Sequence, residues 1–440
     1  MIGTIAKREI LEYLKSAKFL IGLLITLAIA VGSTVINVQD FQQRQQDYVA
    51  AQNEMKGNLF DISIYRPPQV LSILVQGKDR ILGNKASVNY LQIPDRLSGY
   101  MGTRYTERQR SLSGFGFVDF AFLVRVVLSL MVVFLTYNAV AEEKSFGTLK
   151  LALANALPRH HILLGKFFAG LAIVLGSLLV AAAVTVLILL TQPTLKLTGD
   201  DGLRIASLIV ASALYLIVFY TLSLFVSTAI NRPSIALMVL LQLWVFLVVI
   251  YPHLGMDIAE HFYRLPTDRE LSQRKQAAEA STDDEFKKVR DAYFKDYSPE
   301  SGSRYLELQI VRSQKTHDVD RDFGLQLSRQ RELAQRIAIL SPAVLFDRMA
   351  ERYAQTGIDE YERFMQSVVR YWQTKYLDLQ RLRYKDLNAY RKAQAPALDH
   401  PAERTAESWV ATLPQGFVLG FVSLVFFGLA YTAFLKKDVR

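Results

Sequence analysis

The chain has 440 residues, of which 51% are hydrophobic and 21% charged, with a formal net charge of +10. This mixture indicates apolar blocks that cross a bilayer and polar blocks outside it, and it is not the composition of a disordered chain. Cysteine is absent, which excludes disulfides, thiolate metal sites and a cysteine nucleophile.

The excess positive charge lies mostly in the apolar blocks and their short connections. Basic and acidic residues balance in the long polar segment 254–407. A nucleic-acid groove needs its basic residues on a polar surface. We therefore expect no nucleic-acid partner.

Six apolar stretches are each about long enough for an α-helix that crosses roughly 30 Å of hydrocarbon. Unpaired backbone groups are unfavourable in lipid, so helices are the natural interpretation. Buried helices of a large soluble protein are disfavoured, because six such stretches far exceed what soluble domains contain. We predict an all-α polytopic membrane protein with six transmembrane helices at 19–36, 117–138, 162–190, 205–228, 235–252 and 409–435.

The segment 1–18 has apolar residues mostly at three- and four-residue intervals and polar residues on the other side. This pattern predicts a helix that lies in the membrane interface. A cleaved signal peptide is the alternative, because Ala28-Ile29-Ala30 resembles a cleavage site. We expect an uncleaved anchor, because 1–18 is long and patterned for the basic region of a signal.

Lys and Arg indicate the orientation of the helices. If the N-terminus is inside, the connections 139–161 and 229–234 and the tail 436–440 are also inside. These segments are basic, whereas charges balance in the short outer loop 191–204. We expect a multi-pass protein of the cytoplasmic (inner) membrane with both termini in the cytoplasm. Two large polar segments then lie on the outer side, 37–116 as a mixed domain and 253–408 as a mainly helical one.

Local signals within 253–408 mark two helices. Ser341-Pro342 is typical of a helix start, and Gly357 is expected to end that helix. Asp359 with Glu362 resembles a capping box for the next one. Apolar and aromatic residues then follow at helical spacing and predict a packing face: Tyr361, Phe364, Met365, Val368, Trp372, Tyr376, Leu379 and Leu382.

Asp318, Asp320 and Asp322 alternate as in a calcium loop, which also needs glycine at its sixth position and glutamate at its twelfth. Phe323 and Arg329 occupy those positions. We therefore expect a solvated charged turn and no metal. The chain has no recognisable nucleophile, metal or cofactor motif, so we expect neither an enzyme nor a cofactor.

The connection between the second and third helices reads AEEKSFGTLKLALANALPRHHILLGK over 141–166. Two acids before a glycine, an apolar run and Pro-Arg predict a compact inner helix within 139–161. The simplest interpretation is a short interfacial helix with a polar start. A soluble partner protein is able to bind the exposed face of this helix and move it.

An acidic pair, Gly-Thr-Leu, a later Pro-Arg and Gly-Lys at the next span resemble the pattern of type-2 ABC exporter permeases. That family has an interfacial connecting helix, six membrane helices and a coupling helix between the second and third. The short loop 191–204 and the tight turn Asn231-Arg232-Pro233 also fit. The enlarged outer segments resemble a branch of gliding-motility and nitrous-oxide-accessory permeases.

The resemblance implies a permease subunit driven by a separate ATP-binding subunit, two copies of which dock on the coupling helix. It also implies a second permease chain, identical or related. No Gly-x-x-x-x-Gly-Lys-Ser/Thr occurs, so the chain itself is not expected to hydrolyse ATP. The ATPase-coupling residues that the resemblance implies are Glu142, Glu143, Lys144, Phe146, Gly147, Thr148, Leu149, Pro158, Arg159 and Lys166.

Arg125 is the one charged residue well inside a predicted span, and Asp119 lies near the outer end of the same span. Intramembrane arginine is costly and usually faces a cavity or a partner. The functional interpretation is a pathway-lining or dimer-facing residue. The alternative is snorkelling to the outer surface or a structural pair.

A different function is also compatible with this sequence. The chain is then a receptor, or an ABC-coupled membrane protein that does mechanical work on the envelope through its outer helical domain, without solute transport.

Overall fold

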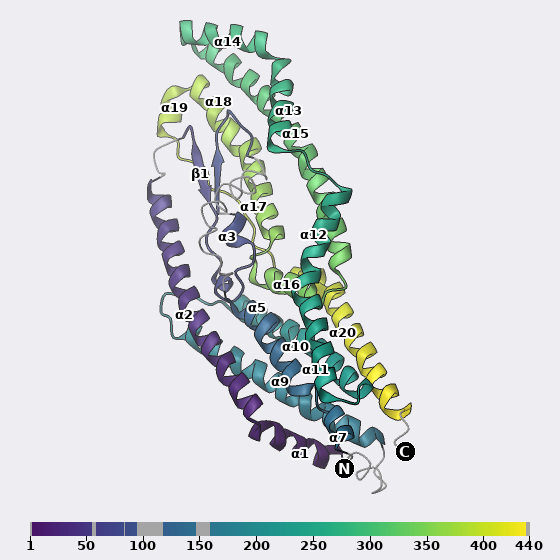
Figure 1. Cartoon of the computed structure of the whole chain (residues 1–440). Coiled ribbons are helices and arrows are strands. Elements are labelled where there is room, and N and C mark those ends of the chain that lie inside the picture. Colours follow the sequence, from purple (N-terminus) through teal and green to yellow (C-terminus); the bar gives the residue numbers. More distant parts are fainter. Residues whose placement is uncertain (1, 55–58, 83, 95–117, 147–158, 437–440) are drawn as a thin grey trace.

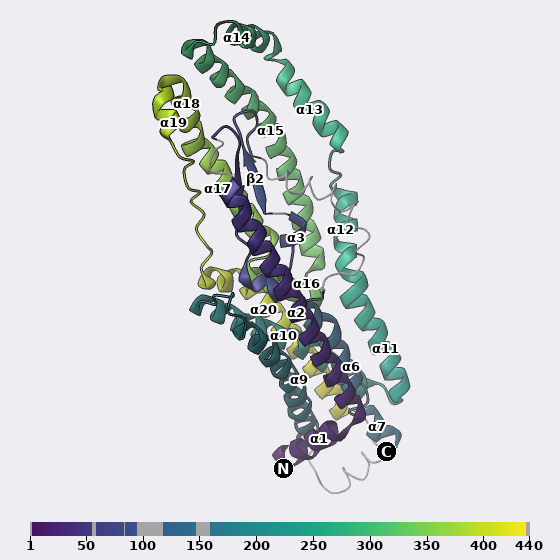
Figure 2. The same ribbon diagram turned by 90° about the vertical axis from the view of Figure 1, so that its left-hand side faces the viewer.

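The computed structural model describes residues 2–54, 59–82, 84–94, 118–146 and 159–436. Figure 1 shows an elongated molecule, with apolar helices at one end and a polar domain at the other. The helix α1 (Ile2–Lys15) and the end of α20 (Thr405–Lys436) lie at the same end in both views (Figures 1 and 2). Because the number of predicted spans is even, the two ends of the chain are expected on the same side of the membrane.

Six helices among the described residues are long and apolar enough to cross a membrane, which confirms the predicted number and the all-α class. They are Ala17–Gln52, Phe120–Ser145, His160–Leu190, Gly199–Ala229, Pro233–Phe262 and Thr405–Lys436. Their elements are α2 (Ala17–Glu54), α5 (Phe120–Phe122), η2 (Leu123–Leu128), α6 (Ser129–Thr136), α7 (Ala141–Ser145), α9 (Arg159–Leu190), α10 (Gly199–Ala229), α11 (Pro233–Val245), η3 (Phe246–Ile250), α12 (Tyr251–Phe262) and α20. The first and fifth helices continue beyond the predicted ends at residues 36 and 252, into the polar domain.

The helix α10 lies at the centre of the membrane bundle and packs against α6, α9 and α20. Its middle residues Tyr215, Leu216, Phe219 and Tyr220 are fully buried. The Thr198 hydroxyl accepts a hydrogen bond from the Asp201 amide and the Asp201 side chain accepts one from the Thr198 amide, so a capping box begins the helix. The short loop before α10 therefore ends at a well-defined residue.

The polar domain contains a two-stranded antiparallel sheet and a set of helices. Its elements are β1 (Ile62–Tyr65), η1 (Val70–Ile73), α3 (Asp79–Leu82), β2 (Lys85–Val88), α13 (Asp268–Ala280), α14 (Asp283–Asp296), α15 (Pro299–Ala338), α16 (Pro342–Ala354), α17 (Ile358–Tyr371), η4 (Trp372–Tyr376), α18 (Leu377–Lys385) and α19 (Leu387–Lys392). Ile62 pairs with Val88 and Ile64 with Ala86, which sets the register of the two strands.

The two polar segments share one hydrophobic core. Ile62 and Val88 of the strands belong to the same buried cluster as Phe364 and Trp372 of the helical segment. The Trp372 indole donates to the Asn89 carbonyl at 2.9 Å. The aromatic residues of α17 and η4 therefore form the packing face that their spacing predicted.

Helix boundaries near residue 357 differ in part from the prediction. The Ser341 hydroxyl accepts from the Val344 amide at the start of α16, as expected. However, α16 ends at Ala354 and is followed by Gln355 with a left-handed φ of 56°. Gly357 instead begins α17 as its N-cap. The predicted capping box of Asp359 and Glu362 is therefore wrong, because both residues lie inside the helix.

The aspartates of the calcium-like motif lie within α15, so the predicted charged turn is also wrong. Asp320 is buried and pairs with Lys275 at 2.6 Å. Burial raises the pKa of Asp320, although the Lys275 ammonium opposes the rise. Among the residues that the structure describes, no group of three or more histidines or acids is arranged to hold a metal ion.

Candidate functional site

The helix α7 begins the connection in which the sequence predicts coupling. Its first turn carries Glu142 and Glu143, where carboxylates interact favourably with the helix dipole. The amides of Val140 and Ala141 both donate to the Ser227 hydroxyl, at 3.0 and 3.2 Å. Because Ser227 lies near the end of α10, these bonds fix α7 to the central helix of the bundle.

Lys166 of α9 joins three elements at this end of the bundle. Its side chain is only 6% exposed, and its Nζ lies 2.8 Å from Glu9 Oε1 of α1 and 2.9 Å from Glu143 Oε1 of α7. A buried ammonium is costly unless carboxylates and hydrogen bonds compensate for its lost hydration. The two carboxylates provide this compensation, so the node depends on all three side chains.

The neighbouring Gly165 lets α1 approach α9 closely. A Cβ atom at Gly165 would lie 2.7 Å from Ile5 Cγ2, which is too close for an alanine without movement of α1. Burial raises the pKa of Tyr13 to about 12, while the Lys166 charge opposes the rise. The Gly-Lys pair of the motif thus has two structural roles, close helix contact and an ion pair.

The opposite side of α7 faces away from the protein. Glu142 is exposed and Phe146 is 73% exposed. The two residues are four positions apart, so they lie on one face of the helix. We call this pair the exposed α7 face.

The predicted coupling residues therefore divide into two groups. Glu143, Lys144 and Lys166 make internal contacts, and the Lys144 ammonium donates to the Thr228 carbonyl. Glu142 and Phe146 form the exposed face. Arg159 is the first residue of α9. Gly147, Thr148, Leu149 and Pro158 lie outside the described residues.

Glu9 is a member of this node that the sequence analysis did not single out. The signal for it was present, because Glu9 and Tyr13 lie four residues apart on the otherwise apolar side of α1. A carboxylate on an apolar helix face indicates a buried cationic partner. No such local signal marks Asp347, the partner of Arg125.

Arg125 pairs with the polar domain rather than with Asp119. Its Nη1 lies 2.5 Å from Asp347 Oδ2 of α16. Asp119 instead caps α5, accepting from the Phe122 amide at 2.7 Å and the Gln76 amide at 2.9 Å. Burial raises the pKa of Asp119 to about 6 against the effect of these bonds. Arg125 thus links the second span to the polar domain.

A cavity of about 710 Å³ lies beside this ion pair. Arg125 contributes to its wall together with residues of η3, α15, α16, α17 and α20. The cavity is therefore at the junction of the spans and the polar domain. Arg125 both lines a cavity and forms a structural pair, two properties that the sequence left as alternatives.

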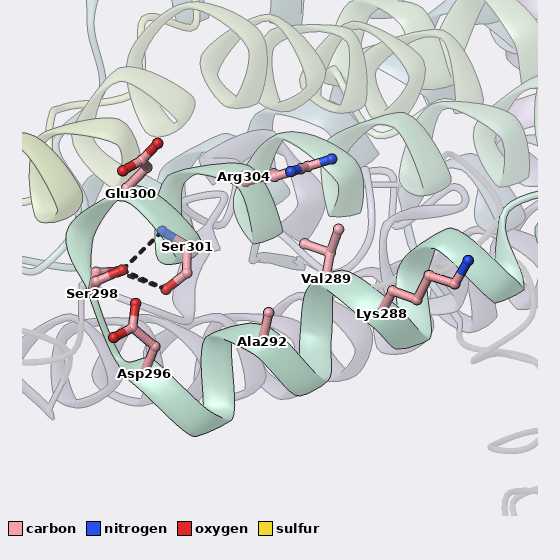
Figure 3. Close-up of a pocket in the computed structure, with 8 residues that line it drawn as sticks. All are labelled: Lys288, Val289, Ala292, Asp296, Ser298, Glu300, Ser301 and Arg304. Carbon is pink, nitrogen blue, oxygen red and sulfur yellow. Dashed lines mark hydrogen bonds between the residues drawn. The ribbon is translucent and has the colours of Figure 1, made fainter.

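A smaller recess of about 320 Å³ lies between α14 and the start of α15 (Figure 3). The Ser298 hydroxyl there accepts from the Ser301 amide and caps α15. Lys288 and Arg304 also line the recess, but the structure brings none of the predicted site residues to it. The helix start explains the Ser298 and Ser301 hydroxyls of this recess.

Comparison with known proteins identifies the family. No curated protein sequence matches the chain. A family model described as ABC-2 family transporter protein matches residues 3–439, nearly the whole chain. The match covers all six spans, the polar domain and the connection that begins with α7. The chain therefore belongs to the ABC-2 transporter family and is a membrane-embedded permease component of an ABC transporter.

Proposed function

We propose that the chain is the membrane-spanning permease of an ABC exporter and that a separate ATPase drives it by docking at the exposed α7 face and the segment that follows. The single observation that supports this most strongly is the Lys166 node. A force on α7 would reach α1 through Glu9, α9 through Lys166, and α10 through Ser227. Three elements of the bundle would then respond together.

The proposed assembly contains two ATPase copies and a second permease chain, identical or related. The side that carries α1, α7 and the end of α20 is the cytoplasmic side of the inner membrane, because ATP is there. The polar domain then lies outside. Family membership supports the ATPase partner and the membrane context.

Binding of the ATPase tests the docking face directly. We expect Glu142→Lys with Phe146→Ala to abolish co-purification of the partner ATPase when the two subunits are co-expressed. The control is Glu12→Gln, since Glu12 is an exposed acid on α1 whose ion pair among the described residues is with Arg8. Retention of the ATPase by the double variant, at normal folding, would contradict docking at α7.

A second candidate function is mechanical work on the envelope. It is favoured by the stiff connections between spans and domain. The helices α2 and α12 run from the bundle into the domain, and buried Arg204 of α10 donates to the Glu403 and Tyr353 carbonyls. Movements of the spans would therefore reach the domain. Solute efflux that requires ATP would favour the exporter, and ATP-dependent domain movement without efflux would favour the mechanical function.

A further inference from the structure

The cavity beside Arg125 has an apolar side and a charged side. Its apolar side comes from Val126 of η2, Val248 and Val249 of η3, and Ala411 of α20. These residues belong to three spans. Val126 and Ala411 lie near the first residue of theirs, and Val248 and Val249 lie midway along Pro233–Phe262. A volume of about 710 Å³ is in the range of small-molecule sites in proteins.

The apolar wall is continuous with the exposed apolar surface of the bundle. Val249 lines the cavity and is nevertheless 47% exposed, and its neighbour Ile250 is 46% exposed. In a membrane protein such residues contact acyl chains. A molecule with an acyl chain is therefore able to reach the cavity from the bilayer.

Both spans that supply the valines are π-helical at this point. The π-helical segments are η2 (Leu123–Leu128), which presents Arg125 and Val126, and η3 (Phe246–Ile250), which presents Val248 and Val249. Single π turns within α-helices are rare and occur frequently at functional sites. Two of them in one cavity wall are an observation independent of the volume.

The charged side contains an arginine that has no ion pair among the described residues. Arg348 of α16 lines the cavity, and the neighbouring Arg125, Arg352 and Arg363 all have carboxylate partners within 4 Å. Burial lowers the pKa of Arg348 against the attraction of Asp359 and Glu351. A half-buried guanidinium is stabilised by an anion that supplies charge-assisted hydrogen bonds.

Asp359 opposes an anion at this place but pairs with Arg352 at 2.7 Å. Glu351 opposes an anion too. It is one turn from Arg348 on α16 and lines the same cavity. Burial raises the pKa of Glu351 to about 7, although Lys78 opposes the rise. Protonation of this carboxyl reduces the negative charge beside Arg348.

We propose that this cavity binds an amphiphile with an anionic headgroup and an acyl chain, with Arg348 at the headgroup and the valines of η2 and η3 along the chain. The site differs from the exposed α7 face and does not depend on an ATPase. Binding is measurable on the permease alone, so its failure and the failure of the proposed coupling are distinguishable.

A cysteine reporter provides the measurement, because the natural chain has no cysteine. Gln335→Cys places one thiol in the cavity wall. The protein, in nanodiscs of zwitterionic lipid, is treated with a membrane-impermeant maleimide in the presence of dodecyl phosphate. We expect dodecyl phosphate to slow the labelling in a saturable manner, and neither inorganic phosphate nor dodecyltrimethylammonium to do so.

Two variants of this reporter test the charged side. Arg348→Gln should weaken protection by about tenfold or more, the effect of losing a hydrogen bond to a charged group. Glu351→Gln should strengthen it, because an opposing carboxylate is removed. The matched control is Arg321→Gln, since Arg321 is exposed on α15 and pairs with Asp318 away from the cavity.

Several results would overturn the proposal. Equal protection by inorganic phosphate would show that the acyl chain is irrelevant, and equal protection by the cationic amphiphile would show that Arg348 does not select charge. Equal losses of protection in the Arg348 and Arg321 variants would also show that Arg348 does not select charge. If Arg348→Gln does not fold, Glu351→Gln decides, and unchanged protection by that variant contradicts the site.

Discussion

Lys166 and Glu143 form an ion pair across the base of the bundle, with 2.9 Å between Nζ and Oε1. Glu143 is one of two adjacent acids, and its neighbour Glu142 is exposed. Adjacent residues on a helix point in different directions. One acid therefore holds α7 in place, while the other is exposed and accepts a hydrogen bond from the Asn138 side-chain amide.

Removal of the Lys166 charge should destabilise the protein. In Lys166→Met the carboxylates of Glu9 and Glu143 lose their shared cation, and breaking a buried ion pair in this way costs about 3–5 kcal/mol. The thermal unfolding midpoint in detergent should fall, whereas Lys15→Met, at an exposed position of α1, should leave it nearly unchanged. Equal midpoints for both variants would show that the node contributes no stability.

The link between the second span and α16 is testable by a double-mutant cycle. Arg125→Met and Asp347→Asn should each destabilise the protein, and the double variant should be less destabilised than the sum of the two. We expect a coupling energy of about 0.5–3 kcal/mol, as for residues in direct contact. Additive effects on the unfolding midpoint would mean that the ion pair is energetically unimportant.

Glu351 should make stability depend on pH. Its folded pKa of about 7 lies above its ordinary value near 4.5. The unfolded state therefore releases its proton first, so stability is fully present below pH 4.5 and falls as pH rises toward 7. Glu351→Gln should remove this fall and stabilise the protein at pH 8 relative to wild type. Unfolding midpoints at pH 5 and pH 8 measure the difference, and identical pH profiles for the two proteins would be inconsistent with the raised pKa.

The orientation is testable with single cysteines at exposed positions of each side. Ser281→Cys and Ser87→Cys lie in the polar domain, and Ser145→Cys lies on α7. A membrane-impermeant maleimide on cells with a permeable outer barrier should label the first two and spare the third. The opposite labelling pattern would reverse the topology and place the exposed α7 face away from ATP.

Local sequence signals predicted those elements that depend on residues close together in the chain. Runs of apolar residues predicted the six spans, and Ser341-Pro342 predicted the start of α16 because both residues act within one helical turn. The same kind of reasoning failed at Asp320. There the 40-residue helix α15 and the Lys275 partner outweigh the turn preference of aspartate.

Contacts between distant residues were not predictable from local patterns. Asp347 is 222 positions from Arg125, and nothing near either residue indicates the other. The shared core of the two polar segments was not predictable for the same reason, since Ile62 and Trp372 belong to one cluster only in the folded domain. The motif analysis singled out the connection that begins with α7 but did not separate the internal Glu143 from the exposed Glu142. That separation depends on where α9 and α10 lie.

The rate of ATP hydrolysis by the reconstituted complex tests the central claim most directly. The comparison is between wild type, Phe146→Ala and the Glu12→Gln control in the same lipid. If the exposed α7 face receives the ATPase, Phe146→Ala removes an aromatic anchor of the contact. Stimulation of hydrolysis by the permease should then fall by about tenfold or more while the permease stays folded. Wild-type stimulation and transport in Phe146→Ala, at normal expression, would contradict the assignment of α7 as the site that the ATPase drives.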